Sequence, residues 1–151
     1  DLPMSTIVPG NRQQMISHGH LKFAPLICYE IAYTGQARNM ARSANVILTV
    51  SNDTWFGDSI GPDQHLQIAQ IRARELGKPV VRATNDGLTA FINARGRVEQ
   101  ELPRFEKAIL RHSVIPATTV TPYALAGEVT TVILLLIILT LTRKNETSIP
   151  D

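Results

Sequence analysis

The sequence predicts an α/β domain in which helices cover a sheet. Two short runs rich in β-branched residues, 46–50 and 79–84, are separated by a helical pattern over 64–76. Closely spaced turn residues then follow, as expected for hairpins. Strands that alternate with helices and lead into hairpins are typical of a layered α/β fold. At 151 residues with 44% hydrophobic content, the chain suits one domain or part of a larger one.

The first half of the chain begins with a polar stretch over 1–20 that glycines and prolines interrupt, and we expect a loop there. A strand is expected over 21–27, where Pro25 favours an irregular or edge position. A short helix is expected over 34–43, with Thr34 as its N-cap. The strand over 46–50 has the near-continuous apolar pattern of a strand covered on both faces.

The clearest helix covers 64–76, with Asp63 as its cap and Gly77 at its end. After the strand over 79–84, Asn85-Asp86-Gly87 predicts a tight turn in which the glycine adopts a positive φ. Three further strands are expected, over 88–93, 98–102 and 108–114.

The C-terminal part is more apolar than the rest. Residues 123–142 are about as long as a helix that crosses a ~30 Å hydrocarbon core, and Arg143-Lys144 follows them. Because positive residues beside a span prefer the cytoplasm, we expect residues 1–122 outside and a cytoplasmic tail over 143–151. Its uninterrupted apolar centre is short, so a buried helix of a soluble protein is the alternative.

Composition limits the partners. A net charge of +2 with scattered basic residues gives no indication of nucleic-acid binding. A single cysteine excludes an internal disulfide and a multi-cysteine zinc site. His18-Gly19-His20 lacks a third ligand, so we expect no metal, and nothing in the sequence implies a dissociable cofactor.

Cys28, the single cysteine, follows an apolar strand and precedes helix-forming residues. A nucleophile there stands clear of the sheet, beside the free N–H groups of the next helix. The alternative is a small buried hydrophobic residue. Residues 51–58 follow the next strand, and their small polar and aromatic side chains are typical of a binding loop. The alternative is a turn whose Trp55 fills the edge of the core.

Several motifs occur together and in order, at Ile27-Cys28-Tyr29-Glu30 and over 51–57, 72–76, 84–87 and 121–124. This set closely resembles the nitrilase-type domain of the bacterial apolipoprotein N-acyltransferase family. The resemblance covers nearly the whole chain, from Leu2-Pro3-Met4-Ser5 to the apolar C-terminal part.

The resemblance implies part of a nitrilase-like αββα sandwich and a Glu–Lys–Cys catalytic set. It also implies a reaction at the periplasmic face of the bacterial inner membrane, with no cofactor. A cysteine takes an acyl chain from a phospholipid as a thioester. The N-terminal amine of a diacylglyceryl-cysteine apolipoprotein then removes that chain as an amide.

Carried over by motif, Cys28 is the nucleophile, which suits a thioester that an amine can open. Glu30 is expected to orient a neighbouring cation, and the backbone N–H of Tyr29 to bind the oxyanion. Trp55, with Asn52 and Phe56 in the same loop, is expected to border the lipid-binding cleft.

One part of the family's pattern is missing. Its glutamate base and its lysine precede the nucleophile strand, whereas no glutamate precedes Cys28 here, and Lys22 does not fit the lysine motif. We therefore expect the C-terminal part of such an enzyme, inactive alone. Three alternatives remain: a soluble nitrilase-type hydrolase that uses water as acceptor, a binding module without catalysis, and a Cys–His mechanism with His65 as base.

Overall fold

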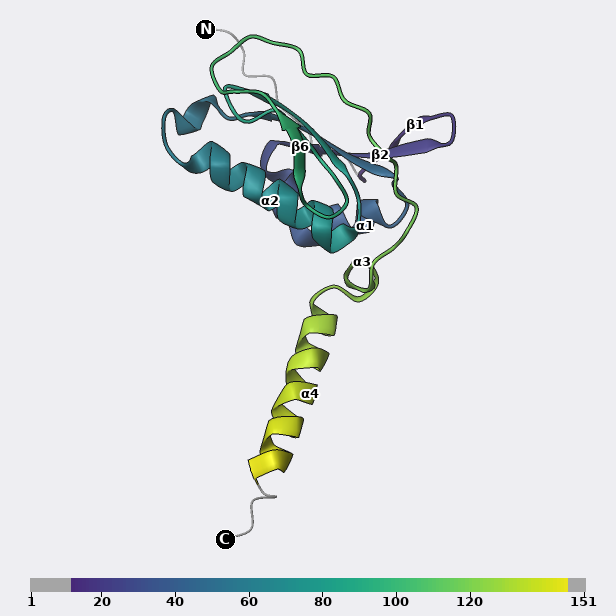
Figure 1. Cartoon of the computed structure of the whole chain (residues 1–151). Coiled ribbons are helices and arrows are strands. Elements are labelled where there is room, and N and C mark those ends of the chain that lie inside the picture. The colour runs from purple at the N-terminus through teal and green to yellow at the C-terminus, as the bar shows by residue number, and fades with distance from the viewer. Residues whose placement is uncertain (1–11, 147–151) are drawn as a thin grey trace, which may run out of the picture.

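Six strands form one mixed sheet in the computed structural model, which describes residues 12–146 (Figure 1). The strands lie in chain order and are β1 Ile16–His18, β2 Leu21–Ile27, β3 Val46–Asn52, β4 Val80–Asn85, β5 Ala90–Ile92 and β6 Val98–Glu101. The α-helices are α1 Thr34–Ala41, α2 Gly61–Leu76, α3 Pro122–Ala126 and α4 Glu128–Glu146. Two short 3₁₀ helices, η1 Cys28–Ala32 and η2 Thr54–Phe56, follow β2 and β3.

The three central strands, β2, β3 and β4, are parallel, and the other pairs in the sheet are antiparallel. Ala24 pairs with Ile47, and Ile47 pairs with Val80. Parallel neighbours need crossover connections, which α1 and α2 supply. The carboxyl ends of β2, β3 and β4 therefore meet at one edge of the sheet.

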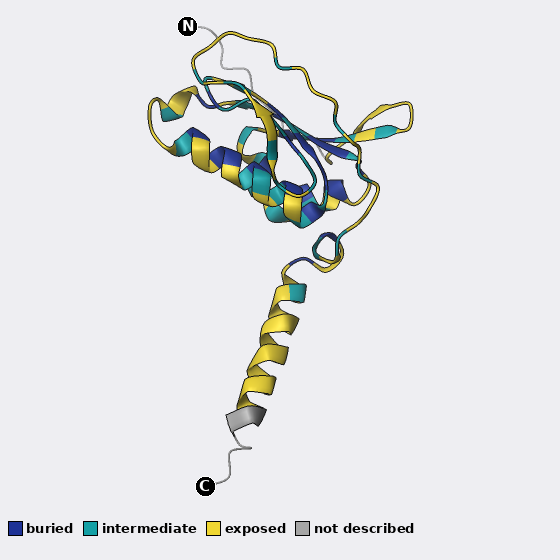
Figure 2. Ribbon diagram, in the orientation of Figure 1, coloured by how far each residue is buried: buried dark blue, intermediate teal, exposed yellow. Residues whose placement is uncertain are grey.

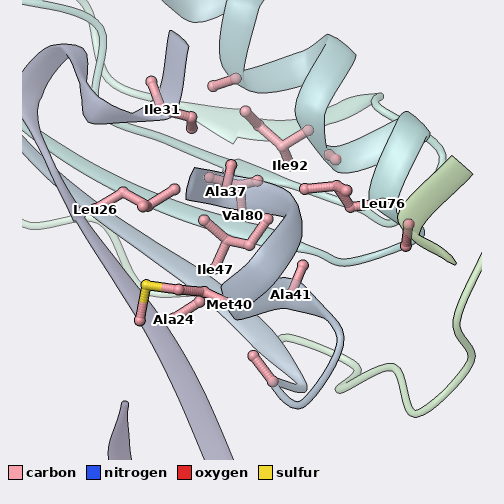
Figure 3. Close-up of a cluster of buried hydrophobic side chains, with 14 of the residues drawn as sticks. Ala24, Leu26, Ile31, Ala37, Met40, Ala41, Ile47, Leu76, Val80 and Ile92 are labelled. Carbon is pink, nitrogen blue, oxygen red and sulfur yellow. The ribbon is translucent and has the colours of Figure 1, made fainter. Parts of the chain in front are cut away.

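Both crossover helices pack on the same face of the sheet (Figure 2). The core between them contains Leu26, Ile47 and Val80 from the strands and Ala37 and Leu76 from the helices (Figure 3). The opposite face is only partly covered, since 63% of Ile27 is exposed. The described residues thus form one sheet and one helical layer, which confirms the α/β class.

The expected strand over 21–27 is confirmed as β2. The pairing between β1 and β2 stops at Phe23. Pro25 comes after that point, so its missing N–H interrupts no hydrogen bond to β1. The strands expected over 46–50 and 79–84 are confirmed with shifted ends. The helix expected over 34–43 ends at Ala41, and Tyr33 rather than Thr34 is its N-cap residue.

Several other expectations are wrong in detail. The helix expected over 64–76 begins at Gly61 because Pro62 suits its first turn, so Asp63 is not the cap. In the turn after β4, Asp86 rather than Gly87 has the positive φ. Residues 108–114 form no strand, because they find no partner strand within the described residues.

The strands outside the parallel centre of the sheet also differ from the expected bounds. The strand expected over 88–93 is the shorter β5, and the one over 98–102 ends at Glu101. The expected loop over 1–20 contains β1, which pairs with β2 as a hairpin. Residues 1–11 lie outside the described part, as does the end of the expected tail, 147–151.

The expected membrane helix over 123–142 is corrected by the structure. Gly127, with φ 61°, separates α3 from α4, so the apolar stretch is not one continuous helix. Glu128 then begins α4, and the segment between it and Arg143 is shorter than the ~20 residues a spanning helix needs. Within residues 12–146, no helix combines the length and apolarity required to cross a membrane.

Candidate active site

Cys28 lies at the edge of the sheet where the parallel strands end. It is the first residue of η1, directly after β2, and its side chain is partly buried. Its φ of 54° is in the left-handed region, which is unfavourable for a residue with a Cβ atom. Such backbone strain in a non-glycine residue is most common at functional sites.

Glu30 and Tyr29 occupy the same short helix as Cys28. The Glu30 carboxylate accepts a hydrogen bond from the backbone N–H of Ile27 at 2.7 Å, which fixes the start of η1. Among the described residues, no cation lies within ion-pair distance of Glu30. The Tyr29 ring is 51% exposed and lies 5.8 Å from the ring of His65.

Behind η1 lies a buried polar network centred on Asp53. This carboxylate, at the end of β3, is fully buried and accepts from Arg82 of β4 at 2.7 Å and from Ser51 at 2.5 Å. His65 of α2 places Nδ1 3.0 Å from Asp53 and Nε2 3.3 Å from the Cys28 carbonyl oxygen. The network therefore joins η1, the end of β3, β4 and α2 beneath Cys28.

Burial sets the charge state of this network. Burial lowers the pKa of His65, the nearby positive charge of Arg82 lowers it further, and Asp53 acts in the opposite direction. Burial also lowers the pKa of Arg82, against the attraction of Asp53 and of a Cys28 thiolate. The Cys28 atom that His65 contacts is the backbone carbonyl oxygen, so this geometry does not favour His65 as the base of a Cys–His mechanism.

The loop after β3 places its three predicted residues differently. Trp55 is 83% exposed and points away from the core. The Asn52 side-chain oxygen accepts from the Thr54 hydroxyl at 2.6 Å, so it stabilises η2. The Phe56 ring lies 6.4 Å from His65 and above Gly61, where an added Cβ would clash with it.

Cys28, Tyr29 and Phe56 are thus brought together around His65, whereas Asn52 and Trp55 are turned toward the loop and the solvent. Sequence reasoning missed Asp53 and Arg82. Arg82 could have been found because it is a charged residue inside the apolar run 79–84. An arginine buried in a strand needs a carboxylate partner, which would have directed attention to Asp53.

Within residues 12–146, no three His, Cys, Asp or Glu side chains gather closely enough to hold a metal ion. His18 and His20 are exposed.

The chain is similar to curated proteins named apolipoprotein N-acyltransferase. It is 49% identical over 124 residues to that of Pseudomonas aeruginosa strain PAO1, which covers 82% of this chain and 24% of the relative. It is 45% identical over 130 residues to that of Haemophilus influenzae, covering 85% of this chain and 25% of the relative. The chain therefore spans about a quarter of the length of these relatives.

Solved structures show the same fold at lower identity. A Saccharomyces cerevisiae member of branch 10 of the nitrilase superfamily matches with a TM-score of 0.57 and 23% identity, over 68% of this chain and 41% of that one. An amidase from Nesterenkonia sp. matches with a TM-score of 0.53 and 23% identity, over 63% and 39%.

Residues 2–121 match the sequence pattern of the carbon-nitrogen hydrolase family. The match includes all six strands of the sheet and the candidate site. With most of its length matched, including the strand, the turn and the cysteine described above, this chain belongs to the carbon-nitrogen hydrolase family.

Proposed function

We propose that this chain is the nucleophile-bearing part of an apolipoprotein N-acyltransferase. The observation that carries the proposal is its 44–49% identity to enzymes of that name over more than four fifths of its length. The position of Cys28 supports it, because a strained cysteine between a parallel strand and a short helix suits a nucleophile.

In the first step, the Cys28 thiolate attacks the ester carbonyl carbon of a phospholipid. The carbonyl oxygen becomes an oxyanion, and we propose that the backbone N–H of Tyr29 in η1 stabilises it. When the tetrahedral intermediate collapses, the C–O bond breaks. The lysophospholipid leaves as an alcohol after gaining a proton, and the acyl group remains on Cys28 as a thioester.

In the second step, the N-terminal amine of a diacylglyceryl-cysteine apolipoprotein attacks the thioester carbon. The C–S bond breaks, the amine loses a proton, and the acyl chain becomes an amide while Cys28 returns to the thiolate. Glu30 contributes by fixing the start of η1 through the N–H of Ile27. Phe56 and the exposed Trp55 border the approach to this turn, where aromatic rings suit acyl chains.

The general base and the lysine of the family set are proposed to come from residues upstream of this chain. The relatives are about four times longer, and no glutamate precedes Cys28 in the sequence. The same upstream part would complete the αββα sandwich by covering the open face of the sheet around Ile27 and Val50, both of which are exposed.

We also propose that the enzyme acts at the bacterial inner membrane, with this domain on the periplasmic side. Its proposed donor is a membrane lipid, and α4 exposes about half of each apolar side chain from Val129 to Leu141. Side chains of this kind favour contact with lipid over contact with water.

The test is replacement of Cys28 by alanine in the full-length gene product. We expect unchanged protein to show an acyl-sized mass increase after incubation with phospholipid, and Cys28→Ala to show none and to transfer no acyl chain to a lipopeptide amine. Acyl release to water with no amide product would instead indicate a hydrolase. Transfer that persists in Cys28→Ala would contradict the proposal.

A further inference from the structure

The strained backbone of Cys28 needs support from its surroundings. A non-glycine residue in the left-handed region costs about 1–3 kcal/mol and persists only where neighbouring contacts hold it. One support lies before the cysteine, where Glu30 accepts the N–H of Ile27 at 2.7 Å. The carbonyl groups at the end of η1 need a second support, because the last carbonyls of a short helix have no partners within it.

Arg72 of α2 supplies that second support. Its Nε donates to the carbonyl oxygen of Ile31 at 3.0 Å, and its Nη2 lies 3.4 Å from that of Ala32. The same Nη2 donates to the hydroxyl of Thr34 at 2.8 Å, at the start of α1. One guanidinium therefore joins the end of η1, the start of α1 and the middle of α2.

Arg72 is itself held in place. Its side chain is only 11% exposed, and its Nη1 contacts the carboxylate of Glu75 on the next turn of α2. The backbone carbonyl of Glu75 in turn accepts from the hydroxyl of Thr121 at 2.5 Å. The Glu75 carboxylate keeps the planar guanidinium pointed at η1, and the Thr121 hydrogen bond fixes the backbone of the helix turn that carries this carboxylate.

The same face of α2 also reaches the beginning of η1. His65 lies two helical turns before Arg72, so the two side chains project in the same direction. Its Nε2 is 3.3 Å from the Cys28 carbonyl oxygen. Helix α2 therefore contacts the first and the last carbonyl groups of the turn that carries the sulfur.

We propose that Arg72 is a positioning residue for Cys28, holding the end of η1 against α2 so that the cysteine keeps its left-handed backbone and its place at the sheet edge. The inference rests on the proposed role of Cys28 as nucleophile. The guanidinium is required because it directs several N–H groups in fixed directions at once. A lysine has one flexible ammonium group and cannot reproduce that arrangement.

The experiment compares Arg72→Lys with Arg74→Lys in the full-length gene product. Arg74 lies on the same helix but is exposed, and it makes no hydrogen bond to η1. We expect Arg72→Lys to slow thioester formation at saturating phospholipid by about 10- to 100-fold, since a small misplacement of a reacting group has effects of that size. The KM for phospholipid should change less than about twofold, and Arg74→Lys should match the unchanged protein.

A second readout separates positioning from general loss of stability. We expect hydrogen exchange of residues 28–33 to be faster in Arg72→Lys, while exchange in the central turns of α2 stays as in the unchanged protein. Thr34→Val removes one acceptor of Arg72 and should give the same pattern with a smaller rate loss. It also serves as a milder variant should Arg72→Lys fold poorly.

Three results would overturn the proposal: an acylation rate of Arg72→Lys within about twofold of the unchanged protein, an equal loss in Arg74→Lys, or a slow Thr34→Val with unaltered exchange in residues 28–33. These outcomes differ from failure of the proposed function, in which Cys28→Ala itself retains acyl transfer.

Discussion

His65 is the buried histidine of the candidate site, and its surroundings lower its pKa. It is 2% exposed and lies between Asp53 and the Cys28 carbonyl, with Arg82 in the same network. Burial and the charge of Arg82 lower its pKa below the ordinary value of 6.5. As pH falls, the unfolded chain therefore takes up this proton more readily than the folded chain does.

We expect His65 to make its full contribution to the free energy of unfolding above about pH 6.5. As pH falls from there toward the lowered pKa of His65, this contribution should decline by at most about 1.4 kcal/mol per pH unit. Urea unfolding at pH 7.5 and 5.5 measures the decline. His65→Gln should reduce the difference between the two pH values, whereas His18→Gln, at an exposed position, should leave it unchanged. An equal difference in His65→Gln would contradict this assignment.

The residues of the site were only partly predictable from sequence. Cys28 was recognisable from its place between an apolar strand and a helical segment, and residues 51–58 from their polar and aromatic pattern. The contacts of Asp53 with Arg82 and His65 were not recognisable. These partners come from β4 and α2, and local patterns do not encode contacts between distant segments. The direction of the Asn52 side chain likewise depends on its contact with Thr54.

At the scale of elements, the turn after β4 depends on close approach rather than on the backbone of its glycine. An added Cβ at Gly87 would lie 2.4 Å from Asp53 Oδ2 and 2.8 Å from its Cβ. Asp53 has no room to retreat, because it is buried and bonded to Arg82 and His65. The glycine is therefore needed for packing against the buried carboxylate.

We expect Gly87→Ala to lower the free energy of unfolding by about 1–3 kcal/mol through overpacking against the Asp53 network. The control is Gly35→Ala in α1, where an added Cβ meets no atom within 4 Å. There, stability should be unchanged or rise by up to about 1 kcal/mol, since alanine favours helix more than glycine does. Urea midpoints of the two variants measure the difference, and a Gly87→Ala midpoint at or above that of Gly35→Ala would disprove the packing argument.

Strands with continuous apolar runs and the long helix were the most predictable elements. β2, β3 and β4 carry apolar runs and α2 carries a helical period, and their positions were predicted to within a few residues. Residues 108–114 have similar apolar content but pair with none of the strands in the described part of the chain, and content alone does not create a pairing partner. The 3₁₀ helix η1 was missed because a short helix has almost no periodicity to detect.

At the largest scale, residues 12–146 form a sheet domain and a helix that extends away from it. Figure 1 shows α4 projecting from the domain through α3, and Figure 2 shows that most of its visible surface is exposed. Its apolar side chains are 49–60% exposed, which is unfavourable in water. Full burial of one such side chain contributes about 1.5–3 kcal/mol, so several together favour a lipid surface strongly.

We therefore expect a protein that ends at Ala126 to keep its sheet domain and to lose binding to phospholipid vesicles. Co-sedimentation with phosphatidylglycerol-containing vesicles measures the binding, and circular dichroism measures the fold. Cys28→Ala, which keeps α4, is the control and should bind as the unchanged protein does. Vesicle binding that is equally strong without residues 127–151 would place the lipid contact elsewhere, for example at the loop carrying Trp55.

Gly127, between α3 and α4, packs closely against α1. The glycine has a positive φ, and a Cβ there would lie 2.3 Å from the guanidinium of Arg38 on α1. The guanidinium of Arg38 therefore lies directly against the backbone at the junction between α3 and α4. Arg42 of the same helix donates to the carbonyl oxygens of Ala124 and Leu125, so under the proposed function α1 links the lipid-facing helix to the segment that carries Cys28.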